Sequence, residues 1–323
     1  MSGSFRALAL KLILGVILPL SWVTGDCAQN LPQGRPLRTT PLAKNLYLIS
    51  PGLDSQDGNV VVLCNGAGNL LSDTGLSREV PELQVAVDGL PCPNHTIKFV
   101  INTHWHLDHA GGNRVFAAGG AVIVAQDEAR RTMSSSQKLM GSTVSAYPEI
   151  ARPTITFSDR ATVHLGDVDV IAEHYANAHT SGDAVVSFGG TGVMHIGDIY
   201  YGAVFPWVDA DHGGSILGLR SALARLLQQQ DSSVFVPGHG EPITKSELNT
   251  MARMIDASLE MVRNGIARGL SLRQMQEKGV PKEWKSYAWE GMSESAWIEA
   301  VYREMATGRA PQFSRRPYRH ADS

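Results

Sequence analysis

The chain has 323 residues, of which 43% are apolar, and a formal net charge of −3 at pH 7. A chain of this length and apolar content can bury a sizeable core as one large domain with an extension. The slight negative charge offers no general attraction to nucleic acid, so we expect no nucleic-acid partner and disfavour a nuclease.

Residues 1–25 have the layout of a secretory signal peptide. A basic start is followed by an apolar run from residue 8 to residue 20 and then by small residues, and we expect cleavage after Gly25. Because the apolar run is too short for a comfortable membrane span, the sequence predicts a periplasmic or secreted protein without a stable span after cleavage. Retention as an uncleaved anchor, or as a lipoprotein through Cys27, is the alternative.

Residues 26–41 are rich in Pro, Gly and polar types and predict a linker. Short apolar runs separated by turn residues then predict a meander of strands at 46–49, 59–64 and 69–72. The apolar run at 97–101 predicts a further, buried strand.

Three cysteines remain after the expected cleavage, namely Cys27, Cys64 and Cys92. Export permits a disulfide, but an odd number leaves at least one thiol unpaired within a monomer. The sequence does not select the pair, and a bridge between Cys64 and Cys92 is one option.

The segment 103–112, directly after the buried strand, contains three imidazoles and one carboxylate within six consecutive residues: His104, His106, Asp108 and His109. Two imidazoles one residue apart project the same way from extended backbone, and a turn begun at Asp108 can place a second pair beside the first. Imidazole and carboxylate suit zinc, with iron or manganese as other options. Four such groups are costly to bury unpaired, so we interpret the segment as a metal site rather than a polar turn.

The elements after this segment fall into two groups. Short helices are predicted at 115–118 and 127–133 around a strand at 121–125, and residues 134–146, which have no firm period, are a candidate rim over the site. A second group of strands is predicted at 154–157, 161–165, 168–175, 184–188, 193–196 and 233–236. Helical spacing at 215–227, 248–267, 270–278 and 294–305 predicts an outer helix and then a helical C-terminal extension and tail, 246–323.

Some downstream polar and aromatic residues keep two interpretations. The aromatic patch that begins at Tyr200 and ends at Trp207 fits a buried core hairpin as well as a substrate wall. His195 fits the core as well as a supporting position near the site, and His212 fits the substrate mouth as well as a solvated loop.

The pattern His104-x-His106-x-Asp108-His109 resembles the signature of the metallo-β-lactamase-fold hydrolases. One further motif of that family precedes it and three follow it, and the resemblance covers about residues 42–245. These motifs are Leu70-Leu71-Ser72-Asp73-Thr74-Gly75, Ala178-His179-Thr180-Ser181-Gly182-Asp183, His195-Ile196-Gly197-Asp198 and Val236-Pro237-Gly238-His239-Gly240. Five motifs in the family's order are far more specific than any one of them.

The resemblance implies an α+β four-layer αβ/βα sandwich with the metals at one edge between the sheets, where periodicity predicts only α/β or α+β. It also implies two zinc ions per chain and assigns Asp73 as a hydrogen-bonding support rather than a ligand. The implied ligands are His104, His106 and His179 for one zinc, Asp108, His109 and His239 for the other, and Asp198 as the bridge.

The resemblance further implies a zinc-dependent hydrolase in which a metal-bound hydroxide attacks a small-molecule substrate and Asp108 also acts catalytically by orienting the water. The leading expectation is therefore an exported, β-lactamase-like enzyme that opens a cyclic amide or ester, a β-lactam or a lactone. Some lactamases place Cys or Ser near Asp198, whereas Asp is similar to glyoxalase II, so hydrolysis of a thioester or sulfur compound is the first alternative. A di-iron oxidoreductase and a non-catalytic binding protein are alternatives of other classes.

Overall fold

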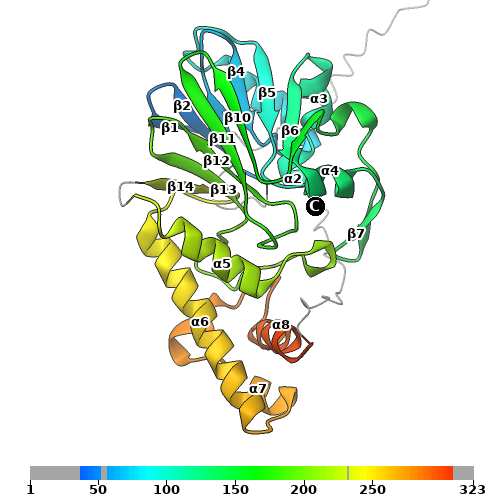
Figure 1. Cartoon of the computed structure of the whole chain (residues 1–323), viewed down its shortest axis with the longest axis vertical. Helices are drawn as coiled ribbons and strands as arrows, with labels where there is room; N and C mark the ends of the chain where they lie inside the picture. The colour runs from blue at the N-terminus through cyan, green and yellow to red at the C-terminus, as the bar shows by residue number, and fades with distance from the viewer. Residues whose placement is uncertain (1–36, 52–56, 231–232, 308–323) are drawn as a thin grey trace, which may run out of the picture. The chain divides into compact units, whose positions relative to one another are not determined.

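The computed structural model describes residues 37–51, 57–230 and 233–307 (Figure 1). These residues belong to one compact unit, which includes both the predicted hydrolase domain and the predicted helical extension. The predicted signal peptide and Cys27 lie outside the described residues. No helix within the described ranges is long and apolar enough to cross a membrane.

The first sheet contains seven strands in the order β1-β2-β3-β4-β5-β6-β9. Their bounds are β1 Arg38–Ala43, β2 Leu46–Ser50, β3 Val60–Leu63, β4 Asn69–Ser72, β5 Ile97–Ile101, β6 Val122–Gln126 and β9 Ile155–Phe157. Strands β1 to β4 pair antiparallel, whereas β4, β5, β6 and β9 run parallel. The parallel half directs the carboxyl ends of β5 and β6 toward the same edge of the sheet, and the histidine-rich segment follows β5 at that edge.

Strand β1 corrects one prediction. The segment 26–41 is predicted to be a linker, but residues 38–41 pair with β2, with Thr40 opposite Leu48. This strand lies at the edge of the sheet and leaves much of its surface exposed, so its sequence carries the polar composition of a linker.

The second sheet contains five strands in the order β10-β11-β12-β13-β14. Their bounds are β10 Arg160–Leu165, β11 Val168–His174, β12 Ala184–Phe188, β13 Val193–Gly197 and β14 Val234–Pro237. Residues 134–146, whose sequence has no firm period, contain a short separate hairpin of β7 (Gln137–Leu139) and β8 (Ser142–Val144). Three-residue strands are too short to produce a recognisable alternation.

The two sheets pack face to face, and helices cover their outer faces. In β3 all four residues are buried: Val61 and Leu63 join the core between the sheets, whereas Val60 and Val62 join the core beneath α1 (Val80–Asp88) and α3 (Asn113–Ala118). A strand covered on both faces is apolar throughout. The arrangement confirms the predicted four-layer sandwich, although the sequence analysis did not identify α1.

Helices of the second half cover the outer face of the second sheet. The helices α5 (Ile216–Leu226), α6 (Lys245–Ala267) and α8 (Glu294–Thr307) follow this sheet in Figure 1. Their apolar side chains form one cluster with Val185, Met194 and Phe235 of β12, β13 and β14. The remaining elements are α2 Leu107–Ala110, α4 Asp127–Met133, α7 Leu272–Lys278 and the 3₁₀ turns η1 Ser77–Glu79, η2 Glu149–Ala151, η3 Ala210–His212 and η4 Lys282–Tyr287.

The Cys64–Cys92 disulfide is present, as one of the expected pairings. It joins the end of β3 to the segment that follows α1, and both cysteines are buried in the core beneath that helix. The bridge therefore ties the outer helix to its sheet.

Glu304 of α8 attaches the C-terminal helices to the sandwich. Its buried carboxylate accepts hydrogen bonds from the backbone N–H groups of Ile216 and Leu217 at 2.8 and 3.0 Å, and from the Ser215 hydroxyl at 2.6 Å. A carboxylate at this end of α5 satisfies N–H groups that have no partner inside the helix and also interacts favourably with the helix dipole.

Replacing this carboxylate is expected to destabilise the protein. Glu304→Ala should lower the free energy of unfolding by about 2–4 kcal/mol, because the N–H groups at the start of α5, including the buried one of Ile216, lose a charged acceptor. Urea unfolding followed by circular dichroism measures the change. Glu299→Ala is the matched control, because Glu299 lies on the same helix in a partly exposed ion pair with Arg303 and should cost less than about 0.5 kcal/mol. Equal losses in the two variants would show that Glu304 has no special role.

Candidate metal centre

The segment after β5 places its four polar side chains through a strand–turn–helix sequence. His106 is the N-cap of α2 with extended backbone (φ −62°, ψ 153°), so His104 and His106 project together before the chain turns. Asp108 and His109 lie in the first turn of α2. The predicted projection of the two pairs is therefore present.

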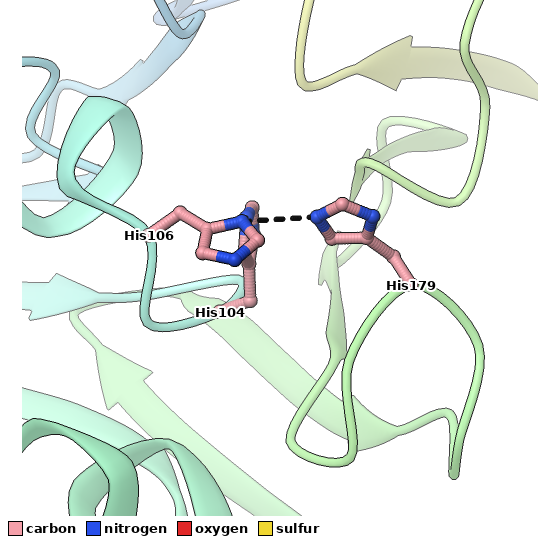
Figure 2. A group of neighbouring side chains, drawn as sticks. All are labelled: His104, His106 and His179. Carbon is pink, nitrogen blue, oxygen red and sulfur yellow. Dashed lines mark hydrogen bonds between the residues drawn. The ribbon is translucent and has the colours of Figure 1, made fainter. Parts of the chain in front are cut away.

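The other predicted residues approach from the second sheet. His179 follows β11, Asp198 follows β13 directly, and His239 follows β14. Figure 2 shows His106, with His104 close beside it, facing His179 across the space between their two loops. The structure thus brings together all seven predicted ligands, in the groups His104, His106, His179; His104, His109, Asp198; and Asp108, His109, His239.

The first cluster consists of His104, His106 and His179, all buried. His106 Nδ1 lies 3.0 Å from His104 Nε2 and 3.0 Å from His179 Nε2, and Asp198 Oδ2 lies 3.5 Å from His179 Nε2. A tetrahedral zinc with bonds of about 2.0–2.1 Å separates its ligand atoms by about 3.3 Å. The spacing of these donor atoms fits one such ion.

The second cluster consists of Asp108, His109 and His239. His239 Nε2 lies 3.2 Å from Asp108 Oδ2 and 3.3 Å from His109 Nε2, and His109 Nε2 lies 3.4 Å from Asp108 Oδ2. These separations fit a second ion by the same criterion. The Asp108 side chain is 27% exposed, compared with 3% for Asp198, so Asp108 is the carboxylate nearer to solvent.

Asp198 faces both clusters, one oxygen to each. Its Oδ2 is the atom near His179, whereas its Oδ1 lies 3.3 Å from His109 Nε2 and 3.6 Å from His239 Nε2. The buried Oδ1 accepts no hydrogen bond of good geometry from any described residue. A cation held between these groups would satisfy an acceptor that is otherwise costly to bury.

A hydrogen bond on the outer ring nitrogen orients each of the five imidazoles. The partners are Thr103 Oγ1 for His104 at 3.1 Å, Asp209 Oδ2 for His106 at 2.9 Å, Asp73 Oδ2 for His109 at 2.9 Å, the Trp207 carbonyl for His179 at 3.1 Å and the Asp57 carbonyl for His239 at 3.2 Å. Such partners fix the tautomer and the ring orientation of a metal-binding histidine. The inner nitrogens therefore converge on the two clusters.

Asp73 supports the site in the predicted way. Besides His109, its carboxylate accepts hydrogen bonds from the Thr103 backbone N–H and hydroxyl, both at 2.7 Å. It is fully buried and has a left-handed backbone (φ 66°), a strained conformation for a residue other than glycine. His195 is also fully buried, with Nδ1 2.8 Å from Ser72 Oγ and Nε2 3.9 Å from Asp73 Oδ2, so it lies in the core behind the site.

The first cluster is electrically suited to bind a cation through neutral imidazoles. Burial, together with the neighbouring imidazoles of His109 and His106, lowers the pKa of His104 well below its usual value. Burial also lowers the pKa of His179 to about 4, against the opposing charge of Asp198. Neutral imidazole is the form that binds a metal.

The second cluster differs in charge. Burial alone would lower the pKa of His109 and of His239, but the carboxylates of Asp108 and Asp198 outweigh it. They raise the pKa of His109 well above its usual value and the pKa of His239 to about 10. Without a metal, the negative charges of the two carboxylates are balanced by the protonated imidazoles of His109 and His239, and a bound metal ion would replace those protons.

Asp209 is a supporting residue that the sequence analysis missed. It is 3% exposed, and its Oδ2 lies 2.9 Å from His106 Nε2 and 2.7 Å from His212 Nδ1, while His212 Nε2 lies 3.2 Å from Gln137 Oε1. Burial opposes its ionisation, but hydrogen bonds with His106 and His212 lower its pKa. His212 therefore belongs to a chain of hydrogen bonds from the β7–β8 hairpin to the first cluster.

Removing Asp209 should weaken the first cluster. Asp209→Ala is expected to lower the affinity for zinc by about 10- to 100-fold, because His106 loses the partner that orients its ring. Competition with a chromogenic chelator measures the affinity. The control is Asp211→Ala, which removes an exposed carboxylate two residues away and should leave the affinity unchanged. Unchanged zinc affinity in Asp209→Ala would rule out this supporting role.

The fold and the site place the chain in a known class. The sequence model of the metallo-beta-lactamase superfamily matches residues 54–239, which is more than half of the chain. The chain therefore belongs to the metallo-beta-lactamase superfamily and is a hydrolase of that group.

Individual relatives are more distant. Over 106 residues the chain is 31% identical to a hydroxyacylglutathione hydrolase from Erythrobacter litoralis (strain HTCC2594), a match that spans 32% of this chain and only 34% of that protein. A metallo-beta-lactamase from Pontibacter korlensis superposes with a TM-score of 0.55 and 18% identity, over 68% of this chain and 99% of that one. The sec-alkylsulfatase Pisa1 from Pseudomonas sp. superposes with a TM-score of 0.61 and 16% identity, over 83% of this chain and 50% of that one. At these identities the two structures establish the fold alone.

Proposed function

We propose that this hydrolase is an exported enzyme that uses two zinc ions to open a cyclic amide or ester, a β-lactam or a lactone. The observation that carries the two-metal hydrolase is the placement of Asp198, which directs one carboxylate oxygen to each of two ligand clusters. The choice of a cyclic amide or ester rests on the expected export. A binding protein with one structural ion would need only one cluster, and a closed one, whereas Asp108 here lies partly open to solvent.

The side chains of the site have three roles: they hold the ions, orient the attacking water and restrict solvent. The first cluster and Asp198 Oδ2 would hold one ion, and the second cluster and Asp198 Oδ1 the other. Bound divalent cations supply Lewis acidity, which lowers the pKa of a water molecule and polarises a carbonyl group. Asp108, the more exposed carboxylate, is placed to accept a hydrogen bond from the attacking water, and the largely buried Trp207 restricts solvent next to His106 and His179.

A thioester is the second candidate substrate. It is favoured by the sequence match to a hydroxyacylglutathione hydrolase and by the Asp at position 198. The same two clusters serve either reaction, because both begin with attack of water on an acyl carbon.

One panel separates these reactions. The purified mature protein is analysed for metals and assayed with a chromogenic cephalosporin, a lactone and a glutathione thioester, with and without a chelator. We expect two zinc ions per chain and chelator-sensitive opening of the lactam or lactone. If the protein contains zinc and hydrolyses only the thioester, the thioester replaces the cyclic amide or ester as the proposed substrate. If it contains iron in place of zinc, an oxidoreductase is favoured.

Export is part of the proposal. The buried Cys64–Cys92 disulfide supports it, because disulfides persist mainly in oxidising compartments. Sequencing the N-terminus of the mature protein should identify Asp26 as its first residue. An intact N-terminus in a cytosolic fraction would contradict export without affecting the proposed chemistry.

A further inference from the structure

The loop after Asp198 is joined to the C-terminal extension at Phe205, which is completely buried. The Phe205 N–H donates to the Tyr287 carbonyl at 2.8 Å, and the Phe205 carbonyl accepts from the Trp289 indole N–H at 2.9 Å. The Phe205 ring stacks on Trp297 with centroids 5.4 Å apart and an interplanar angle of 9°. These contacts hold the extension against the loop that carries the aromatic patch.

Two half-buried rings continue from this junction to the metal centre, and we call Tyr201 and Trp289 the aromatic wall. The Tyr201 ring lies 6.0 Å from the His179 ring and 6.3 Å from the His239 ring, so it is close to both clusters. Trp289 lies 6.4 Å from Tyr201 with an interplanar angle of 32°. Tyr200, Phe205 and Trp207 are almost fully buried, whereas Tyr201 and Trp289 are half-buried and pack against the edge of the same apolar cluster.

Trp289 is fixed in place before any substrate arrives. Besides the indole hydrogen bond, the backbone of Trp289 pairs with Met292 in both directions, at 3.1 and 3.0 Å. Gly291 lies directly under the indole, where an added Cβ would come within 2.2 Å of Trp289 Cη2 and Cζ3. A ring that is already ordered binds a ligand without a further loss of conformational entropy.

We propose that the aromatic wall selects substrates that carry a planar aromatic group beside the acyl carbon under attack. Aromatic rings attract one another in offset or edge-on arrangements at centroid distances of about 4.5–7 Å. Tyr201 lies within that distance of His179 and His239, and Trp289 lies within it of Tyr201. The ring of a phenylacetyl group whose carbonyl is at the clusters would therefore meet Tyr201 first, and Trp289 would extend that surface. The inference rests on the proposed function for the position of that carbonyl, and it assigns the C-terminal extension a role in specificity.

Binding of two carboxylates, phenylacetate and acetate, tests the wall without hydrolysis. Titration calorimetry of the zinc-loaded wild type should show phenylacetate binding about tenfold more tightly than acetate, as expected for one added ring–ring contact of about 1.4 kcal/mol. Trp289→Ala should remove that preference and leave acetate binding unchanged. Trp284→Ala is the matched control, since the Trp284 ring packs edge-on against Tyr287 at 5.3 Å within the extension itself.

Two milder variants keep the test valid if Trp289→Ala unfolds. Trp289→Phe retains a ring and should retain part of the preference, whereas Gly291→Ala displaces the indole and should reduce it with zinc content unchanged. The kinetic test uses a phenylacetyl and an acetyl substrate of whichever class the enzyme hydrolyses. Trp289→Ala should raise KM for the phenylacetyl substrate about tenfold and leave its kcat, and both constants for the acetyl substrate, nearly unchanged.

The outcomes separate the two proposals. Equal binding of phenylacetate and acetate to the wild type, or a preference that survives Trp289→Ala or Gly291→Ala, would overturn the aromatic wall whatever the enzyme hydrolyses. The protein could instead prefer phenylacetate over acetate in a Trp289-dependent way and hydrolyse none of the cephalosporin, the lactone and the thioester. That result would support the aromatic wall and contradict the proposed reaction.

Discussion

Asp198→Asn should reduce the zinc content from two ions per chain to at most one and lower kcat/KM by about a hundredfold or more. The substitution keeps the shape of the side chain but replaces one of its two acceptor oxygens by an NH₂ group, which cannot bind a cation. Since Oδ1 and Oδ2 face different clusters, one of them must lose a ligand.

Metal analysis of the purified variant and steady-state kinetics measure the two effects. Asp169→Asn is the control, because Asp169 is an exposed carboxylate at the start of β11 in the same sheet, where it pairs with His164 of β10. Asp198→Asn with two zinc ions and wild-type turnover would be incompatible with a bridging role.

Acidification should release the two zinc ions at different pH values. At neutral pH the metal-free second cluster holds protons on His109 and His239, because the pKa of His239 is about 10 and that of His109 is raised well above its usual value. Zinc must displace these protons, so its apparent affinity falls by about tenfold per pH unit for each displaced proton as the pH drops below the raised pKa values. In the first cluster the pKa of His179 is about 4 and that of His104 is also lowered, so these rings are already neutral and hardly compete.

Zinc titrations at about pH 8 and about pH 6 should therefore show two affinities with different pH dependence. Between these pH values the affinity of the second cluster should fall by about a hundredfold per displaced proton, whereas that of the first cluster should change little. His239→Ala should remove much of the steep component, because it deletes one of the protonated rings. Parallel loss of both ions, with the same dependence on pH, would show that the two clusters do not differ in charge as described.

Much of the site was predictable because its ligands are local or lie in short motifs. His104, His106, Asp108 and His109 are almost consecutive, and a strand followed by a turn is sufficient to bring them together. His179, Asp198 and His239 are distant in sequence, but each follows a strand of the second sheet and lies in one of the family's short motifs. The buried strands were also identifiable, since a strand covered on both faces must be apolar.

The sequence by itself therefore determined the family, the main strands and the seven candidate ligands that the structure brings together. Only the tertiary structure decided that Asp209 orients His106, that Trp289 stands beside Tyr201, and that Glu304 holds α8 on α5. The physical reason is that these contacts join groups 87 to 103 residues apart in the sequence, through a few hydrogen bonds and ring contacts. Such pairs leave no periodicity or local spacing in the chain, because only the packing of the two sheets and the C-terminal helices places them side by side.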